Sequence, residues 1–191
     1  LLHLWYFNRK KPLSETEVDA YLEYFQQHPQ QHTELDVLKQ FMQEDDGKEI
    51  CIANFVSLYR EKITHPETGQ KVSPHAAVQN YMKVLLGLCA NKACHPIYLA
   101  YRVGGHIDSW GSDDKLDFRG LQMMRYRSRR DFIELIVNPK FASGLDIKFA
   151  AIEKTISYPV KMQLSTFLRP NLWLSLVILI ICCLLQIVLT V

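Results

Sequence analysis

The pair of residues best suited to acid–base chemistry is His106 and Asp108, which follow the Gly104-Gly105 turn and are one residue apart. A histidine titrates near neutral pH and a nearby carboxylate can orient its ring, so proton transfer is chemically available at this position. A glycine-containing turn is equally typical of a solvated loop. His106 and Asp108 are therefore candidates for catalysis, with a solvated turn as the alternative.

A basic cluster lies at the junction of an expected strand and an expected helix. Its members are Arg125, Arg127, Arg129 and Arg130. Guanidinium groups gathered in this way can bind an anionic ligand or acidic lipid headgroups. The alternative is a helix start at which the arginines pair with the neighbouring Asp131 and Glu134.

The sequence gives no pattern for a metal site or a cofactor. His28 and His32 have the spacing of a helical metal pair, but Pro29 between them breaks the helix that would align them. Cys89 and Cys94 are too isolated to form half of a zinc site. Glycine-rich phosphate loops and nucleophile elbows are absent as motifs, and a net charge of +2 gives no reason to expect a nucleic-acid partner.

The cysteine pattern indicates a reducing compartment. The chain has five cysteines, an odd number, and two of them lie in the apolar C-terminal stretch. A disulfide framework of the secreted type is therefore not expected.

The elements that must position these residues follow from hydrophobic periodicity and turn signals. Strands are expected near residues 50–59, 96–103, 118–126 and 152–160, and helices near 15–27 and 33–47, after Ser73, and at 128–137. The order from residue 50 onward is β-α-β-β-α-β, which predicts an α+β domain of the ferredoxin-like type. The expected organisation is a membrane-associated segment at 1–11, a helical hairpin at 12–47, the ferredoxin-like domain at 48–160, a connector at 161–171 and a transmembrane helix at 172–191.

Alternation along the expected strands separates two faces of the sheet. Ile50, Ile52, Val56 and Leu58 share a face that suits packing under helices, interrupted by Asn54. The opposite face is expected to be mixed and to carry Phe55, Tyr59, Tyr98, Arg102, Gln122, Met124, Tyr126, Thr155 and Ser157. Within this set we select Tyr59, Tyr98, Arg102, Gln122 and Tyr126 as residues of a pocket or of a dimer interface, because either would place aromatic and polar groups on one sheet face. A register slip of one residue would exchange the faces.

Several of these segments resemble the small dimeric α/β-barrel superfamily. They are LQMMRYRSRRDFIELIVNPKF at 121–141, the strand ending in SLYRE, the helix containing NYM, and the strand after AIEKT. Within the superfamily the sequence is similar to the uncharacterised group related to NIPSNAP and EthD-like domains, over about residues 50–160. The resemblance implies a ferredoxin-like fold that forms dimers. It implies no specific activity, because the superfamily includes monooxygenases, haem-degrading enzymes, dehydratases, decarboxylases and members without a known reaction.

The C-terminal stretch LWLSLVILIICCLLQIVLTV, residues 172–191, contains no charged side chain and is long enough to cross a bilayer as a helix. Lys154, Lys161 and Arg169 precede it, so the positive-inside rule predicts that the domain faces the cytoplasm. At the other end, the apolar segment LLHLWYF at 1–7 is expected either to end a second membrane helix or to lie as a short helix on the membrane surface.

These observations favour a membrane-anchored, non-catalytic module that forms a homodimer or serves as an accessory subunit of a membrane protein complex, in contact with membrane lipid. The alternative is an enzyme, monooxygenase-like or related, that acts on a hydrophobic or aromatic small molecule in a cavity at the sheet face. Tyr98, Arg102, Tyr126 and His106 are its candidate residues.

Overall fold

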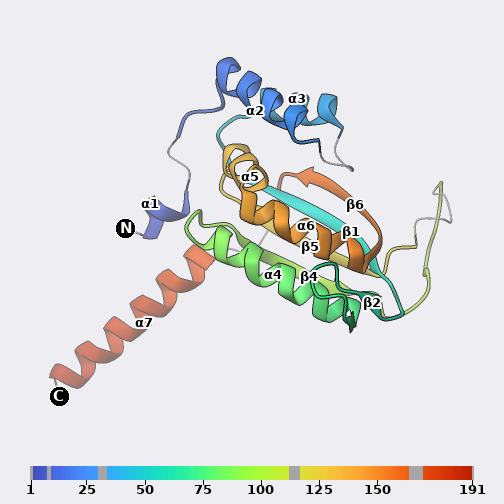
Figure 1. Ribbon diagram of the computed structural model, residues 1–191. Helices are drawn as coiled ribbons and strands as arrows, with labels where there is room; N and C mark the ends of the chain where they lie inside the picture. The colour runs from blue at the N-terminus through green and yellow to red at the C-terminus, as the bar shows by residue number, and fades with distance from the viewer. Residues whose placement is uncertain (1, 8–9, 30–33, 112–116, 164–169, 191) are drawn as a thin grey trace.

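A four-stranded sheet is the centre of the structure, a computed structural model that describes residues 2–7, 10–29, 34–111, 117–163 and 170–190. Its strands are β1 (Ile50–Leu58), β4 (His95–Tyr101), β5 (Gly120–Tyr126) and β6 (Ile152–Val160). They are arranged in the order β4-β5-β1-β6, and each neighbouring pair is antiparallel. The two helices α4 (Pro74–Ala90) and α6 (Pro139–Ala151) lie in front of the sheet in Figure 1, together with α5 (Arg129–Ile136).

The cross-strand register defines two faces of this sheet, each with aligned rows of residues. On one face, Ile52 lies opposite Met124 and Asn54 opposite Gln122. Ile52 and Met124 are buried in the same core cluster as Tyr81 of α4, so this is the helix-covered face. As predicted, the even-numbered positions of β1 pack under the helices. The odd-numbered positions, such as Phe55, belong to the opposite face.

Local capping explains where the predicted helices begin. Ser14 and Glu17 form a reciprocal capping box at the start of α2 (Glu15–Gln27), as their spacing predicts. Ser73 accepts a hydrogen bond from the backbone nitrogen of Ala76, and Pro74 occupies the first turn of α4. The hairpin continues with α3 (Leu35–Gln43), which starts after Glu34 without a side-chain cap.

Helix α6 is not predicted by the sequence patterns. Asn138 and Pro139 are typical of a helix end, and they do follow α5, but the same pair also begins a helix. The Asn138 side chain accepts a hydrogen bond from the backbone nitrogen of Lys140, and Pro139 takes the first turn of α6. Gly144 allows close packing, since a Cβ there would lie 3.1 Å from Cδ2 of Tyr81 on α4. Two short strands, β2 (Ile63–Thr64) and β3 (Lys71–Val72), pair within a segment for which a loop is predicted.

The helical hairpin is joined to the domain through α5. Phe132 on α5 makes edge-to-face contacts with Phe41 of α3 and with Tyr126 of β5, at centroid distances of 5.6 and 5.0 Å. Ile133 is fully buried in the same cluster. The core therefore runs continuously from the sheet through α5 to the amino-terminal helices.

The chain ends in α7 (Pro170–Thr190), which extends away from the domain in Figure 1. Its residues Trp173–Thr190 have a mean hydropathy of 2.7, and none of this window is buried within the chain. In length and composition α7 is able to span a membrane. At the amino end, the short helix α1 (Leu2–Tyr6) lies at the same end of the domain as the start of α7.

Replacement of Ile133 by alanine is expected to destabilise the domain by about 2–5 kcal/mol, because it removes a fully buried side chain and leaves a cavity. The effect would appear as a lower thermal midpoint by circular dichroism. Val37→Ala is the matched control: Val37 is 61% exposed, and its loss should change stability by less than about 0.5 kcal/mol. Equal midpoints for the two variants would contradict the assigned core.

Candidate functional site

A groove of about 1890 Å³ lies along the helix-covered face of the sheet and opens to solvent. Its floor includes one residue from each strand in a single row across the sheet: Leu99, Gln122, Asn54 and Ser157. Its walls come from α4 and α6, and side chains of α2 and α3 line one end. Such concave, largely apolar surfaces are the usual sites of small-molecule binding.

The polar groups of the floor are amides and a hydroxyl. Ser157 Oγ donates to Asn54 Oδ1 at 2.7 Å, and Asn54 Nδ2 donates to the Ile52 carbonyl at 3.3 Å. Gln122 Nε2 lies 3.6 Å from Met82 Sδ. None of these groups titrates near neutral pH, so this row can orient a bound molecule but supplies no general acid or base. The sequence signal for it is Asn54, the polar residue that interrupts an apolar strand face.

The residues expected to form one pocket or interface are divided between the two faces of the sheet, which corrects the predicted grouping. Gln122 lies opposite Asn54, so Gln122 and Tyr126 belong to the helix-covered face. Tyr98 lies opposite Met123 on the other face. The helix-covered face also carries Met124, Thr155 and Ser157, three further residues that the sequence pattern assigns to the other face. Both faces of β5 carry apolar residues, so its alternation does not show which face meets the helices.

The last two members of the predicted set lie near the ends of strands. Tyr59 follows β1, beyond a register irregularity at Ser57 and Leu58, and is 46% exposed at the groove. The Arg102 guanidinium forms an ion pair with Asp117 at the base of the loop between β4 and β5. Neither residue is adjacent to Tyr98 in the rows of paired residues.

His106 and Asp108 lie in the exposed part of this loop. Neither residue lines the groove. Their role as a catalytic pair stays a prediction, and the solvated-turn alternative agrees with their exposure.

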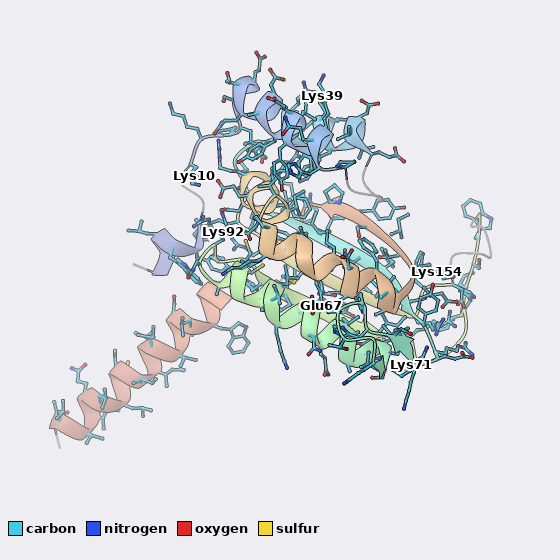
Figure 2. The ribbon with its side chains drawn as sticks, viewed as in Figure 1. Lys10, Lys39, Glu67, Lys71, Lys92 and Lys154 are labelled. Carbon is cyan, nitrogen blue, oxygen red and sulfur yellow. The ribbon has the colours of Figure 1, made fainter. Side chains whose placement is uncertain are left out.

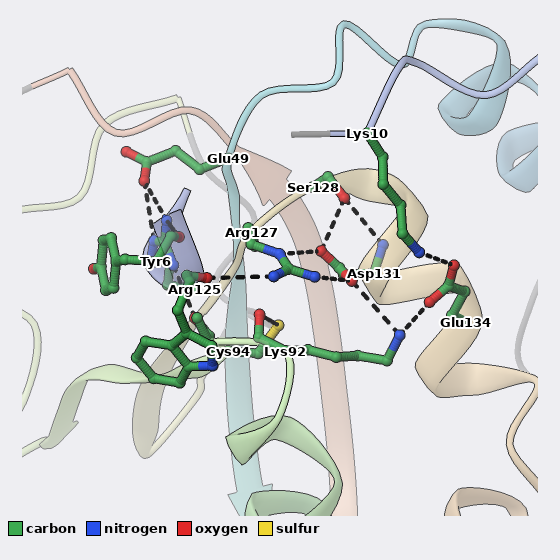
Figure 3. A network of polar contacts seen from close by, with 12 residues as sticks. Tyr6, Lys10, Glu49, Lys92, Cys94, Arg125, Arg127, Ser128, Asp131 and Glu134 are labelled. Atoms are coloured by element: carbon green, nitrogen blue, oxygen red, sulfur yellow. Dashed lines mark hydrogen bonds and ion pairs between the residues drawn. The ribbon is translucent and has the colours of Figure 1, made fainter. Parts of the chain in front are cut away.

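The basic cluster forms an internal network at the end of the sheet next to α1, and Figure 3 shows the part around Arg125 and Arg127 from close by. Asp131, whose side chain is fully buried, accepts hydrogen bonds from both Arg127 Nε and Nη2 at 2.8 and 2.9 Å. Ser128 Oγ donates to the same carboxylate, and Lys92 Nζ is 3.5 Å from it. Burial alone raises the pKa of Asp131, but Arg127 and Lys92 outweigh this effect and the pKa is lowered.

Arg125 holds the amino-terminal segment against the domain. Its guanidinium donates to Glu49 at 2.8 Å, to the Ala93 carbonyl at 2.8 Å and to the Tyr6 carbonyl at 3.1 Å. It also lies 3.8 Å from the centroid of the Tyr6 ring, and Tyr6 is only 1% exposed. The Tyr6 hydroxyl is 3.1 Å from His95 Nε2, and burial lowers the pKa of that histidine.

Arg129 and Arg130 hold the helical hairpin in a similar way. Arg129 donates to the Phe41 carbonyl at 2.7 Å, and Arg130 forms an ion pair with Glu17. The hydrogen bond from Arg130 lowers the pKa of the Glu17 carboxyl to about 2. Figure 2 shows Lys10 and Lys92 at this same end of the domain, where both form ion pairs with Glu134.

All four arginines of the basic cluster thus have acceptors within the chain. This arrangement agrees with the alternative that the arginines pair within the chain. Of the two carboxylates expected as partners, Asp131 pairs with Arg127, whereas Glu134 pairs with Lys10 and Lys92. Binding of an anionic ligand or lipid headgroup by the cluster stays a prediction.

The thiols and histidines of the described residues offer little for nucleophilic or metal chemistry. Burial raises the pKa of Cys89 to about 12 and that of Cys94 to about 11, so both stay protonated at neutral pH. His28 stacks on Tyr24 and hydrogen-bonds its carbonyl, while His32 lies outside the described residues. A search of the described residues finds no group of three or more His, Cys, Asp or Glu side chains that could hold a metal ion.

Comparison with known proteins supports the fold and does not assign an activity. No family model matches the sequence, and no curated protein matches it. Among solved structures, the crystal structure of a protein of unknown function from Rhodopseudomonas palustris is similar over 70% of this chain and 96% of its own, with a TM-score of 0.56 and 18% identity. This similarity shows a shared α+β fold.

Two further structures are more distant. An Arabidopsis thaliana protein and the hydroxynitrile lyase from Passiflora edulis each give a TM-score of 0.39, at 14% and 12% identity. They cover 62% of this chain, and 99% and 98% of their own chains. Similarity this low carries no inference about activity. The relationship to NIPSNAP and EthD-like domains also stays a prediction.

Replacement of Asp131 by asparagine is expected to destabilise the domain by about 3 kcal/mol, because Arg127 and Lys92 would lose a buried counter-charge. At this chain length the loss corresponds to a thermal midpoint lower by about 6–12 °C. Glu153→Gln, which breaks the exposed pair with Arg119, is the control and should shift the midpoint by no more than about 4 °C. If the thermal midpoint of the Asp131→Asn variant also shifts by no more than that of this control, the network around Asp131 does not hold the domain together.

Proposed function

We propose that the chain is a membrane-anchored, non-catalytic module of ferredoxin-like βαββαβ topology whose sheet binds a second copy of itself. The element order β1-α4-β4-β5-α5-α6-β6 and the strand order β4-β5-β1-β6 support this topology, with the second crossover divided into two helices. Such a module could also bind a subunit of a membrane protein complex through the same face.

The observation that carries the proposal is the composition of the sheet face away from the helices. One row across the four strands reads Tyr98, Met123, Ala53 and Tyr158, and the next reads Ala100, Leu121, Phe55 and Ile156. Tyr98 and Tyr158, near the two edges, are 44% and 50% exposed. An apolar centre bordered by tyrosines is typical of protein interfaces. A two-fold axis through the centre of the face would bring these rows against their own copies.

The membrane part of the proposal depends on α7. A helix that is apolar on all sides is stable when lipid or protein surrounds it, and the chain itself buries none of residues Trp173–Thr190. We propose that it anchors the domain. Lys154 and Lys161 precede it in the sequence, which by the positive-inside rule favours a cytoplasmic domain.

The groove is the observation in favour of the alternative, an enzyme acting on a hydrophobic small molecule. However, Tyr98, Arg102, Tyr126 and His106 lie in different places, and the polar row of the floor, Gln122, Asn54 and Ser157, holds no group that titrates near neutral pH. The geometry therefore supports a binding or assembly role better than a catalytic one.

Replacement of both Tyr98 and Tyr158 by glutamate is expected to raise the dissociation constant of the dimer by at least about tenfold, because it brings like charges into an apolar contact. Light scattering of the detergent-solubilised full chain would show a shift from dimer to monomer mass. Val84→Glu is the matched control on the exposed side of α4, where Val84 is 41% exposed, and it should keep the dimer. A monomeric wild-type chain without a co-purifying partner, or a dimeric double variant, would refute the proposed interface.

Replacement of Ile178 and Leu185 by arginine is expected to release the chain from membranes. Each arginine near the centre of a spanning helix costs about 3 kcal/mol, and together they offset most of the apolar gain of α7. Alkaline carbonate extraction would find the double variant in the soluble fraction and the wild type in the membrane fraction. The Ile178→Ala and Leu185→Ala pair should stay with the membrane, and a wild type that is fully extracted would contradict anchoring.

A further inference from the structure

Lys148 of α6 is a lysine in the wall of the groove that forms no ion pair within the described residues. Its side chain is only partly exposed. Its Nζ atom lies 5.1 Å from the ring centroid of Phe149 and 5.7 Å from that of Tyr81. The ammonium group therefore lies near two aromatic rings, and no carboxylate of the described residues is within ion-pair distance.

The packing of α4 against α6 creates this position. Gly144 and Lys148 are one helical turn apart on the same side of α6. Because residue 144 has no side chain, the Tyr81 ring lies close to the α6 backbone, and Phe141 packs against the ring at 6.2 Å. The lysine at the next turn thus extends over the ring into the groove instead of into open solvent.

In such surroundings the positive charge of the Lys148 ammonium group is only partly stabilised. Burial lowers the pKa of Lys148, which shows that its charged form lacks full solvation. The attraction between the ammonium group and the two rings offsets only part of the free energy of solvation that burial removes. The carboxylates that line the groove do not provide the rest: Glu153 pairs with Arg119, and Glu34 and Asp146 are exposed and form no ion pair with Lys148.

The remainder of the groove indicates what kind of anion fits. Its wall beside Lys148 carries Val78, Leu145, Phe149 and Ile152, which suit an alkyl chain. A single ammonium matches a single negative charge, whereas phosphate groups are typically held by several donors or by arginine forks. The combination fits an anion with one charge and a long apolar body.

We propose that the groove binds a single-chain amphiphile with a carboxylate head, such as a fatty acid, and that Lys148 is the counter-ion of its carboxylate. The alkyl chain would lie along the helix-covered face of the sheet. This inference does not rest on the proposed self-association, which uses mainly the opposite face; of the residues named there, Ile156 also lines the groove.

The test uses the full chain in lipid nanodiscs, with decanoate labelled with ¹³C at its carboxyl carbon as the probe. Carboxyl resonances report saturable binding above the signal of empty nanodiscs. Lys148→Met is expected to weaken decanoate binding at least about tenfold, since it removes a charge-assisted contact. Lys148→Arg should stay within about threefold of wild type. Lys83→Met, on the exposed surface of α4, is the matched control and should bind as wild type does.

Decanol is the second probe of this test, because it has the same ten-carbon alkyl chain as decanoate and no charge. The dissociation constant of decanol, obtained from its displacement of bound decanoate, should be the same in wild type and Lys148→Met. The thermal midpoint of Lys148→Met should be no lower than that of wild type, since methionine fills similar space without a charge to desolvate, and this keeps a loss of binding separate from a loss of folding. Unchanged decanoate affinity in Lys148→Met, or no saturable signal in wild type, would overturn the proposal.

Discussion

The structure depends on the acceptors that four guanidinium groups reach at the end of one strand, although among the described residues the buried Nε atoms of Arg129 and Arg130 have no hydrogen-bond partner. Arg125 is the penultimate residue of β5, Arg127 directly follows the strand, and Arg129 and Arg130 begin α5. Besides the neighbouring Asp131, they reach Glu17, Glu49 and the backbone carbonyls of Tyr6 and Phe41, all of which are distant in the sequence. A guanidinium has five donors in a rigid fork, so each can hold several segments at once. The amino-terminal helices are joined to the domain largely through these contacts and through the Phe132 cluster.

The two faces of the sheet differ in how completely they are covered. On the helix-covered face, residues near Tyr126 and Ile52 are buried, but the row containing Gln122 and Asn54 is only partly covered. The groove lies between this row and the helices α4 and α6, and a hydrogen bond from Ser157 to Asn54 joins two side chains of its floor. The opposite face has no such polar row at its centre. The proposed binding groove and the proposed association surface therefore lie mainly on opposite faces of one sheet, with Ile156 common to both.

Much of the fold follows from local sequence signals, because caps and periodic apolar residues act over one or two turns. Ser14, Ser73 and the strand at Ile152–Val160 are examples for which the predicted and observed elements agree. The pairing between strands depends on contacts distant in sequence, so the faces of β5 and β6 could not be assigned from alternation. Helix α6 was obscured because Asn138-Pro139 fits both an end and a start. The arginine cluster is visible in the sequence, but its acceptors are not, since Glu49 and Glu17 lie far from it along the chain.

In the candidate site, the position of Lys148 likewise could not be predicted from local sequence signals. Without α6, nothing in the sequence separates this lysine from the other surface lysines, and its surroundings depend on the missing side chain at Gly144 of the same helix. Only the packing of α6 against α4 shows that the Lys148 ammonium group lies near the rings of Tyr81 and Phe149.

The extension of α7 from the domain has a consequence for how copies of the chain meet. Chains anchored by such a helix diffuse in two dimensions with their domains at a common height above the lipid, so the local concentration of one sheet face near another far exceeds its average in the cell. An interface too weak to assemble in dilute solution can then be well populated. Assembly would respond to the number of chains per area of membrane, and membrane expansion alone could dissolve it.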